Sequence, residues 1–428
     1  MRRAVAALTK SILLAMVLAS VAGPGLAQSS KPSQVLKDLL DRQEKLEEKF
    51  AEAVDKGEAN PYELDARLGE IREQAGRLAA GFQLEGWKNS ELLALAELHQ
   101  IAEQYREAAN VYRTVRRLNP SAPRVEGLDI EGSLIAVLLQ GDQIDEAGAL
   151  LAREFPVRLR DIFIPMARVE LIKSLAYILR DEQRLEQAAE RAWTGYNLAD
   201  QLGKLRTIGK SMRESVQRIQ LSLAALYIAT AERLNRQKES ENMRRLVAKY
   251  DFQSNPVIKT YFEEELKRER LIGRYAPELQ IVQWIGGRPL PLDTWAGKVV
   301  VLDFWAMWCE PCQAAFPAWR DLHAKYGEQG LRLIGVTKWY GRSDRNEDLS
   351  RDEEFKQLQA YREKHKLTYS IAVGAMDDVV NEERYEVTGI PTVVVIDRQG
   401  RIRYIKRGIG DYRRFEKQLR KLLAESSL

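Results

Sequence analysis

Two rhythms of hydrophobic and polar residues divide the chain near residues 271–276. Up to about residue 271, apolar residues recur three and four positions apart while Pro and Gly are sparse, a pattern typical of amphipathic helices. Beyond Gly273 the pattern changes to alternating stretches and short β-branched runs between helical segments, which indicates strands and helices in one layered domain. We therefore predict an all-α region followed by an α/β domain with a mixed central sheet.

The helical part contains a repeat. Three segments share the order apolar, polar, acid or amide, Ala, small: YREAA at 105–109, IDEAG at 144–148 and LEQAA at 185–189. In each segment, a leucine stands thirteen residues before the central alanine. The first unit has large, small, aromatic and proline residues where tetratricopeptide (TPR) repeats have them, at Leu92, Leu95, Ala96, Ala108, Tyr112 and Pro120. Residues 89–200 thus resemble a TPR array, although successive units are 39 and 41 residues apart where that family uses about 34.

These patterns predict the domain organisation. We expect a leader at 1–27, a helical hairpin at 28–88, a TPR-like repeat domain at 89–271 and an α/β domain at 272–428. A generic bundle of helices is the alternative to a repeat array. In the α/β domain we predict strands at 276–287, 298–306 and 331–337, helices at 309–326 and 353–365, two strands within 392–406 and a last helix at 412–425.

The first residues have the composition of a secretory signal peptide. Arg2, Arg3 and Lys10 precede the apolar run SILLAMVLASVA at 11–22, and Gly-Leu-Ala follows at 25–27. We expect cleavage after residue 27 and export to the periplasm. The run of 12 apolar residues is shorter than the roughly 20 that a transmembrane helix needs, so no anchor is expected after cleavage. The leader supplies three of the four net positive charges, so the mature chain is nearly neutral and no nucleic-acid partner is expected.

The only two cysteines, Cys309 and Cys312, lie two residues apart in WAMWCEPC. They follow a predicted buried strand and open a predicted helix, whose first N–H groups favour a thiolate. We expect Cys309 to be the exposed nucleophile and Cys312 to resolve the mixed disulfide that forms. A zinc site would need two more Cys or His ligands. Because His99, His323 and His365 are isolated in the sequence, we expect neither a metal nor a cofactor.

The motif VVVLDFWAMWCEPC and the Gly-Ile-Pro-Thr segment at 389–392 resemble thioredoxin. The segment APELQIVQWIGGRPLPLDTWAGK at 276–298 is similar to the exported TlpA/ResA branch of that superfamily, and the likeness spans about residues 275–425. It implies that Pro391 is a cis-proline facing the cysteines and that Asp303 is a buried acid, able to take the proton of Cys312. Substrate contacts are expected from Trp305, Trp308, Glu310, Pro311 and Ile390.

Two features depart from that family pattern. ResA-type reductases for apocytochrome c carry a glutamate three residues after the second cysteine, and this chain has Ala315 there. A dedicated role in cytochrome c maturation is therefore not implied. The polar segment KWYGRSDRNEDLSRD at 338–352 is longer than the corresponding loop of thioredoxin, and we expect it near the active site.

The sequence therefore favours an exported thiol-disulfide oxidoreductase, acting as a reductase or isomerase. Its expected partners are disulfides of client proteins, a membrane or periplasmic thiol that donates electrons, and a protein bound by the TPR-like domain. One alternative is a TPR-type scaffold whose redox pair only regulates contact with a partner. Another is a peroxiredoxin, which needs a Pro-x-x-x-Thr/Ser-x-x-Cys loop. Residues 302–309 read LDFWAMWC and lack that motif.

Overall fold

The structure is a computed structural model. It describes residues 31–55, 63–122, 124–152, 163–205, 208–250, 252, 255–286, 295–343, 346–374, 380–408 and 412–426. The expected leader at 1–27 lies outside these residues. The chain divides near residue 153 into two compact units, so the second unit contains helices as well as the sheet. Within the described ranges, no helix combines the length and the apolar character needed to cross a bilayer.

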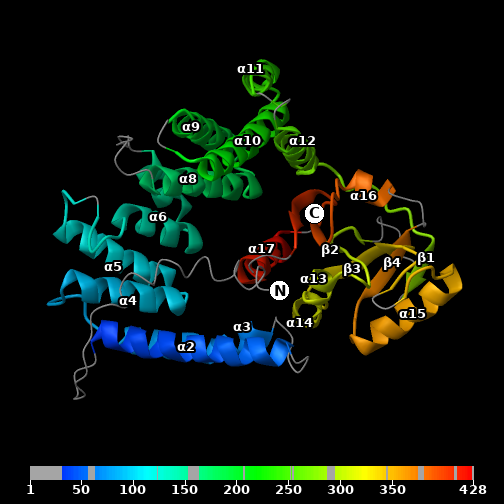
Figure 1. Ribbon diagram of the computed structural model, residues 1–428, viewed down its shortest axis with the longest axis horizontal. Coiled ribbons are helices and arrows are strands. Elements are labelled where there is room, and N and C mark those ends of the chain that lie inside the picture. The colour runs from blue at the N-terminus through cyan, green and yellow to red at the C-terminus, as the bar shows by residue number, and fades with distance from the viewer. Residues whose placement is uncertain are drawn as a thin grey trace. The chain divides into compact units, whose positions relative to one another are not determined.

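The regular elements among the described residues of the first unit are helices, apart from an isolated bridge between Val125 and Leu128. Its elements are α2 (Pro32–Asp55), α3 (Glu63–Ala79), α4 (Asn89–Ile101), α5 (Tyr105–Leu118), α6 (Ile130–Gln140) and α7 (Ile144–Leu151). Helix α4 packs on α5, α5 on α6 and α6 on α7, and α2 packs on α4 (Figure 1). Leucines of α4, among them Leu92 and Leu95, are fully buried against the small residue Ala108 and other apolar positions of α5.

The second unit begins with another set of helices: α8 (Phe163–Asp181), α9 (Leu185–Gly203), α10 (Lys210–Arg233), α11 (Gln237–Val247) and α12 (Pro256–Leu271). Helix α9 packs on both α8 and α10, and α10 also packs on α11 and α12 (Figure 1). Gly195 of α9 allows this close approach, because a Cβ there would lie 2.9 Å from methyl groups of Ile172 and Leu223. Asn255 caps α12 by accepting a bond from the Ile258 N–H, and Pro256 occupies the first turn.

Four helical hairpins share one turn geometry. The residues at the turns of α4–α5, α6–α7, α8–α9 and α10–α11 are Glu103, Asp142, Gln183 and Asn235, all with φ between 58° and 61°. In each case the next N–H bonds to a carbonyl five residues back, at 2.8 Å, as in a Schellman cap. Five residues after each turn residue comes a small, buried side chain, Ala108, Ala147, Ala188 or Ser240. The helical hairpins that the sequence repeat predicts are therefore present, and α10–α11 adds a fourth.

The rest of the second unit is built around a mixed six-stranded sheet. Its strands are β1 (Gln283–Ile285), β2 (Val299–Phe304), β3 (Leu331–Lys338), β4 (Ser370–Gly374), β5 (Thr392–Ile396) and β6 (Ile402–Arg407), in the order β1-β4-β3-β2-β5-β6. The β2–β3 and β3–β4 pairs are parallel, and the others are antiparallel. The helices of this part are α13 (Glu310–Gln313), α14 (Phe316–Tyr326), α15 (Arg351–Lys364), α16 (Val380–Arg384) and α17 (Tyr412–Ala424). The predicted fold class, helices followed by a mixed sheet, is confirmed.

Strand β2 is buried along its whole length and separates two apolar layers. Because side chains alternate along a strand, Val299, Val301 and Trp305 join the layer that also contains both cysteines, while Val300 and Phe304 face the opposite layer. The cysteine layer includes residues of α14, α15 and α17.

Two predicted elements differ from the structure, and two observed elements were not predicted. The strand expected at 276–287 is reduced to the three residues of β1, because the Asn381 side chain bonds to both the N–H and the C=O of Gln280 in place of a neighbouring strand. The helix expected at 309–326 is split into α13 and α14, since Pro317 lacks an N–H and its ring obstructs the carbonyl four residues back. Strand β4 and helix α16 were not predicted.

Candidate active site

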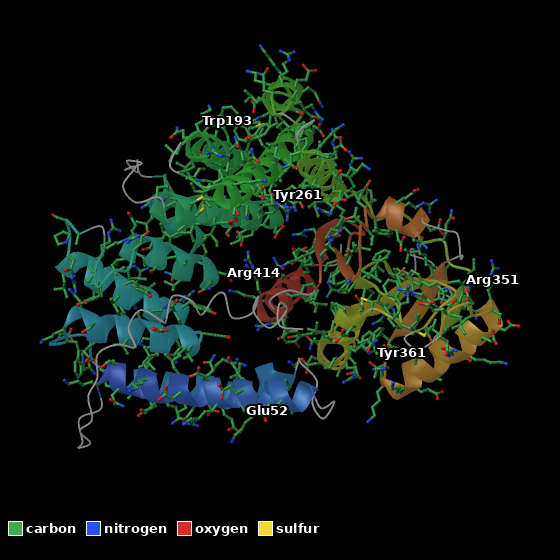
Figure 2. All side chains as sticks on the ribbon, viewed as in Figure 1. Glu52, Trp193, Tyr261, Arg351, Tyr361 and Arg414 are labelled. Carbon is green, nitrogen blue, oxygen red and sulfur yellow. A yellow bond between two sulfur atoms is a disulfide. The ribbon has the colours of Figure 1, made fainter. Side chains whose placement is uncertain are left out.

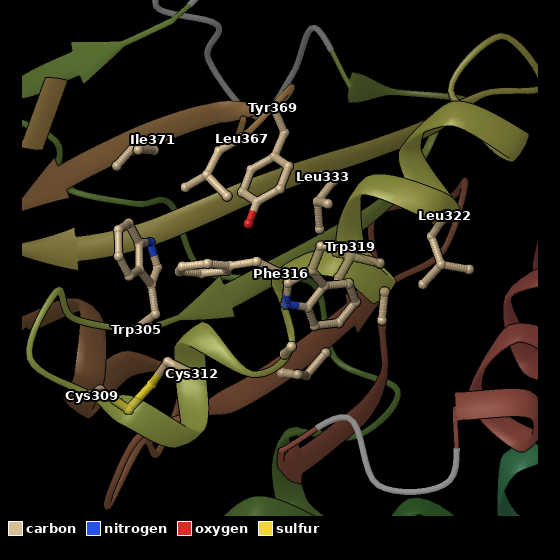
Figure 3. Packing of buried hydrophobic residues seen from close by; sticks show 14 of the residues in the cluster. Trp305, Cys309, Cys312, Phe316, Trp319, Leu322, Leu333, Leu367, Tyr369 and Ile371 are labelled. Atoms are coloured by element: carbon tan, nitrogen blue, oxygen red, sulfur yellow. A yellow bond between two sulfur atoms is a disulfide. The ribbon is translucent and has the colours of Figure 1, made fainter. Parts of the chain in front are cut away.

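Cys309 and Cys312 form a disulfide at the start of α13, directly after β2 (Figure 3). Cys309 is the residue that caps α13, and Cys312 lies inside its single turn, with a Cα–Cα distance of 5.3 Å. The expected exposure of Cys309 is not found: its exposed fraction is 4%, and that of Cys312 is 0%. Both sulfurs belong to the apolar layer against which Trp308 and Ile390 pack. In the oxidised form this covering shields the pair from water.

Asp303 lies on the central strand, in the middle of the second unit's sheet. It pairs with Gly335 of β3 and Val393 of β5, and alternation places its side chain on the layer of the cysteines. Both carboxyl oxygens are buried without a hydrogen-bond partner among the described residues. Burial raises the pKa of Asp303 to about 8, and the indole N–H of Trp319 moderates that rise.

Trp305 and Tyr369 pack over Gly335, the residue of β3 that pairs with Asp303. A Cβ on Gly335 would lie 2.7 Å from the Trp305 indole nitrogen and 3.4 Å from the Tyr369 ring. Trp305 also packs edge-on against Phe316, with ring centroids 5.2 Å apart (Figure 3). The Tyr369 hydroxyl is buried without a partner among the described residues, and burial, followed by the negative charge of Asp303, raises its pKa well above the usual value. Sequence reasoning missed Tyr369, because no strand was predicted beside it.

The loop before β5 contains the expected cis-proline. The Ile390–Pro391 peptide bond is cis, as predicted, and the Pro391 carbonyl accepts a bond from the Gly408 N–H at 2.8 Å. Ile390 packs against both apolar layers. It also lines a small pocket together with Trp305, Lys338, Tyr340 and Glu382. That Pro391 faces the cysteines, and that Ile390 contacts substrate, stay predictions.

The remaining site residues differ in exposure. Glu310 and Pro311, between the cysteines, are exposed, whereas Ala315, at the position of the ResA-type glutamate, is buried. Trp308 is half-buried and packs edge-on against Tyr340, with ring centroids 5.3 Å apart. The long polar loop thus contacts the residue next to Cys309, as the sequence predicts. Nowhere in the described ranges do three or more His, Cys, Asp or Glu side chains form a group able to hold a metal ion.

Comparison with known proteins finds a family match that includes the cysteine pair. Residues 272–405 match the family model described as AhpC/TSA family. The thiol-disulfide oxidoreductase ResA of Bacillus cereus is 28% identical over 162 residues, which cover 38% of this chain and 83% of that protein. ResA of Geobacillus thermodenitrificans is 29% identical over 137 residues, covering 32% of this chain and 70% of that protein. The thioredoxin-like protein YneN of Bacillus subtilis is 27% identical over 163 residues, covering 38% and 86%.

Solved structures match about a third of the chain. A thiol-disulfide isomerase from Corynebacterium glutamicum is 24% identical with a TM-score of 0.31, covering 35% of this chain and 98% of that one. The thioredoxin domain of a thiol-disulfide oxidoreductase from Bacteroides vulgatus is 25% identical with a TM-score of 0.28, covering 35% and 97%. The C-terminal part of this chain therefore carries a thioredoxin-like domain of the AhpC/TSA family, and its relatives include thiol-disulfide oxidoreductases of the ResA kind.

Proposed function

We propose that this protein is an exported thiol-disulfide oxidoreductase that exchanges disulfides with client proteins. The observation that carries the proposal is the disulfide between the chain's only cysteines, at the start of the helix that follows a buried central strand. A disulfide in this position closes a loop of only two intervening residues, so it constrains the unfolded chain little. Redox exchange explains it better than stabilisation.

The chemistry runs through both sulfurs. In the reduced protein, the Cys309 thiolate attacks a client disulfide and forms a mixed disulfide, which releases one client thiolate. The Cys312 thiolate then attacks Cys309 in that mixed disulfide and releases the second client thiolate. The client gains two electrons, and the protein returns to the disulfide form. A dithiol donor must reduce it again, and we propose a thiol in the membrane or the periplasm for that role.

Asp303 fits the role of proton acceptor for Cys312. A carboxyl group with a pKa of about 8 can accept and return a proton near neutral pH, where an ordinary aspartate stays ionised. It lies on the sheet face that carries the cysteines. Only its ionised form can accept the Cys312 proton, and the burial that raises the pKa also makes that carboxylate a stronger base.

The helices are proposed to choose the client or the donor. Stacked helical hairpins commonly present an extended surface for binding, and the four matching turns support a TPR-like array. Trp193 of α9, labelled in Figure 2, is 40% exposed. Its ring packs against the rings of Tyr196 and Tyr227. We expect Trp193→Ser to lower capture of native clients while leaving reduction of a small disulfide unchanged. Equal capture by the variant would contradict this role.

The helices α8–α12 also contact the sheet domain directly. Arg403 of β6 donates to the Asp181 carbonyl at 3.1 Å, Lys421 of α17 pairs with Glu182 at 3.3 Å, and Thr388 donates to Glu264 at 3.2 Å. These contacts, together with the single compact unit that contains both parts, mean that α8–α12 support the redox domain. Experiments on function therefore use the full chain and point substitutions.

The proposal also covers the cellular compartment of the protein and the direction of its disulfide exchange. The proposed leader at 1–27 directs export to the periplasm. Glu310 and Pro311 between the cysteines are shared with the ResA pattern, which favours reduction or isomerisation of client disulfides. A peroxidase reaction is less compatible, because LDFWAMWC at 302–309 lacks the threonine or serine that such a site places three residues before its cysteine.

The test is reduction of insulin disulfides by the full chain with dithiothreitol as the donor. We expect acceleration over dithiothreitol alone, lost in Cys309→Ser. Cys312→Ser is expected to accumulate mixed disulfides with native clients, which non-reducing gels reveal. No acceleration by the wild type would overturn the proposal. Client capture that survives substitution of both cysteines would favour a scaffold instead.

A further inference from the structure

Arg342 lies over the residue that precedes the nucleophile. Its guanidinium carbon is 4.0 Å from the ring centroid of Trp308, a distance at which a cation is attracted to the face of an indole. Trp308 is thus flanked by Arg342 on one face and by the edge-on ring of Tyr340. Both flanking residues come from the long polar loop that follows β3.

The loop is fixed where it carries Arg342. The buried carboxylate of Glu354, in the first turns of α15, accepts bonds from the N–H groups of Tyr340 and Gly341 at 3.0 and 2.9 Å. The Leu349 N–H bonds to the Gly341 carbonyl at 2.7 Å. Arg342 is therefore presented by an anchored backbone, and its position over Trp308 does not depend on the side chain alone.

The positive charge of Arg342 has no carboxylate partner among the described residues. Glu354 is occupied by the two backbone N–H groups, and Glu382 pairs with Lys338 at 2.8 Å. Glu310 lies beside Cys309 and is exposed, but it forms no ion pair with Arg342. A half-buried guanidinium with one face on an indole still offers its N–H edge, which matches a carboxylate in two-pronged geometry.

We propose that Arg342 is a specificity-determining residue that binds a carboxylate of the client next to the disulfide under attack. The preferred clients are then peptides with Asp or Glu flanking the reacting cysteine. This inference rests on the proposed disulfide exchange and adds the chemical class of its substrate. The neighbouring charges of Lys338 and Glu382 neutralise each other in an ion pair. The attraction for a client carboxylate therefore comes from Arg342.

The experiment compares three peptide disulfides that differ only in the residue flanking the cysteine: Glu, Gln or Lys. Reduced full-length protein reacts with each, and kcat/KM is measured at low and high salt with dithiothreitol as the donor. Every variant meets the same peptides, so differences in the intrinsic reactivity of the disulfides cancel. We expect wild type to prefer Glu over Lys by about fivefold, or about 1 kcal/mol, and the preference to shrink at high salt.

The variants separate charge recognition from support of Trp308. Arg342→Gln keeps a polar side chain without the charge and should abolish the preference, while Arg342→Glu should invert it and Arg342→Lys should keep part of it. Arg351→Glu is the matched control, because it makes the same change of charge on an exposed residue at the start of α15 (Figure 2). It should keep the wild-type preference.

The outcomes distinguish failure of this inference from failure of the proposed function. An unchanged preference in Arg342→Gln overturns the inference. So does an equal loss on all three peptides in Arg342→Gln and Arg342→Lys, which would mean that Arg342 only holds Trp308 in place. A wild type that reduces all three peptides equally well also overturns the inference but leaves the proposed function intact. A wild type that reduces none of them overturns the proposed function itself.

Discussion

The helical hairpins and the sheet domain bury polar groups very differently. In the hairpins, helices pack on their neighbours in the chain, and four turns repeat one geometry with small apolar or hydroxyl side chains beneath them. In the sheet domain, Asp303, Tyr369 and three tryptophan nitrogens are buried without hydrogen-bond partners among the described residues, and they surround the cysteines. The comparison teaches that the hairpins are built for regular packing, whereas the sheet domain keeps costly polar groups where the chemistry takes place.

The largest effect should come from Asp303→Asn. In the oxidised protein, burial raises the pKa of Asp303 from its usual value to about 8. Between pH 4 and 8 the unfolded chain is ionised while the folded one keeps its proton, so wild-type stability falls as pH rises through this window, by on the order of 5 kcal/mol. The variant should lack this loss. Urea unfolding at pH 5, 7 and 9 measures it, and parallel pH profiles for the two proteins would show that the carboxyl is not perturbed.

A buried ion pair among the helices should give the next largest effect. Arg180 of α8 donates to Glu269 of α12 at 2.5 Å and to Asp181 at 2.6 Å, and both Arg180 and Glu269 are buried. Arg180→Met leaves the buried Glu269 carboxylate unpaired and should lower the free energy of unfolding by about 3–5 kcal/mol. Arg77→Met, which removes an exposed partner of Glu73, should cost about 0.5 kcal/mol or less. Equal costs in urea unfolding would remove the distinction between buried and exposed pairs.

Two glycines sharpen the comparison further. In Gly335→Ala the new methyl meets the rigid Trp305 indole at 2.7 Å, so we expect a loss of about 1–3 kcal/mol. In Gly195→Ala the methyl meets only the ends of the Ile172 and Leu223 side chains at 2.9 Å, and the better helix propensity of alanine, about 1 kcal/mol, offsets that crowding. Denaturation midpoints should fall in the first variant and stay nearly unchanged in the second. The reverse order would mean that the helices are the more tightly packed region.

The smallest effect concerns residues with positive φ. Lys366 ends α15 with φ 50°, and Asn235 ends α10 with φ 59°. Lys366→Gly should raise the free energy of unfolding by about 0.5 kcal/mol, because relief of the left-handed conformation exceeds the entropy that glycine adds to the unfolded chain. Asn235→Gly should change it less, since asparagine tolerates this conformation. Thermal unfolding of the two variants tests the ranking, which a larger gain for Asn235→Gly would contradict.

Local pattern was enough to predict most of the helices, the buried strand β2 and the cysteine pair. The repeat centred on Ala108, Ala147 and Ala188 gave three hairpins, while the fourth lacked the signal because Ser240 replaces the alanine and Tyr227 replaces the leucine thirteen residues before it. The resemblance to thioredoxin implied the rest of the predicted site, including Asp303 and Pro391.

The missed features depend on contacts between distant segments. Strand β4 is a short apolar run whose identity is set by pairing with β3 and β1. Tyr369, just before it, becomes a neighbour of Asp303 only through that pairing. The stacking of Arg342 on Trp308 likewise depends on where Glu354 anchors the loop, and the small extent of β1 depends on an asparagine side chain about one hundred residues away. No local pattern encodes such contacts.

The four matching turns have a consequence for how this chain can vary. Successive turn residues are 39, 41 and 52 residues apart, yet the small residue always follows its turn residue by five. Most of this variation lies in the length of the helices, since α5 and α6 have 14 and 11 residues whereas α9 and α10 have 19 and 24, and none falls within the turns. The helices can therefore lengthen or shorten without a change in the turn, because each turn residue and its small residue keep the same spacing.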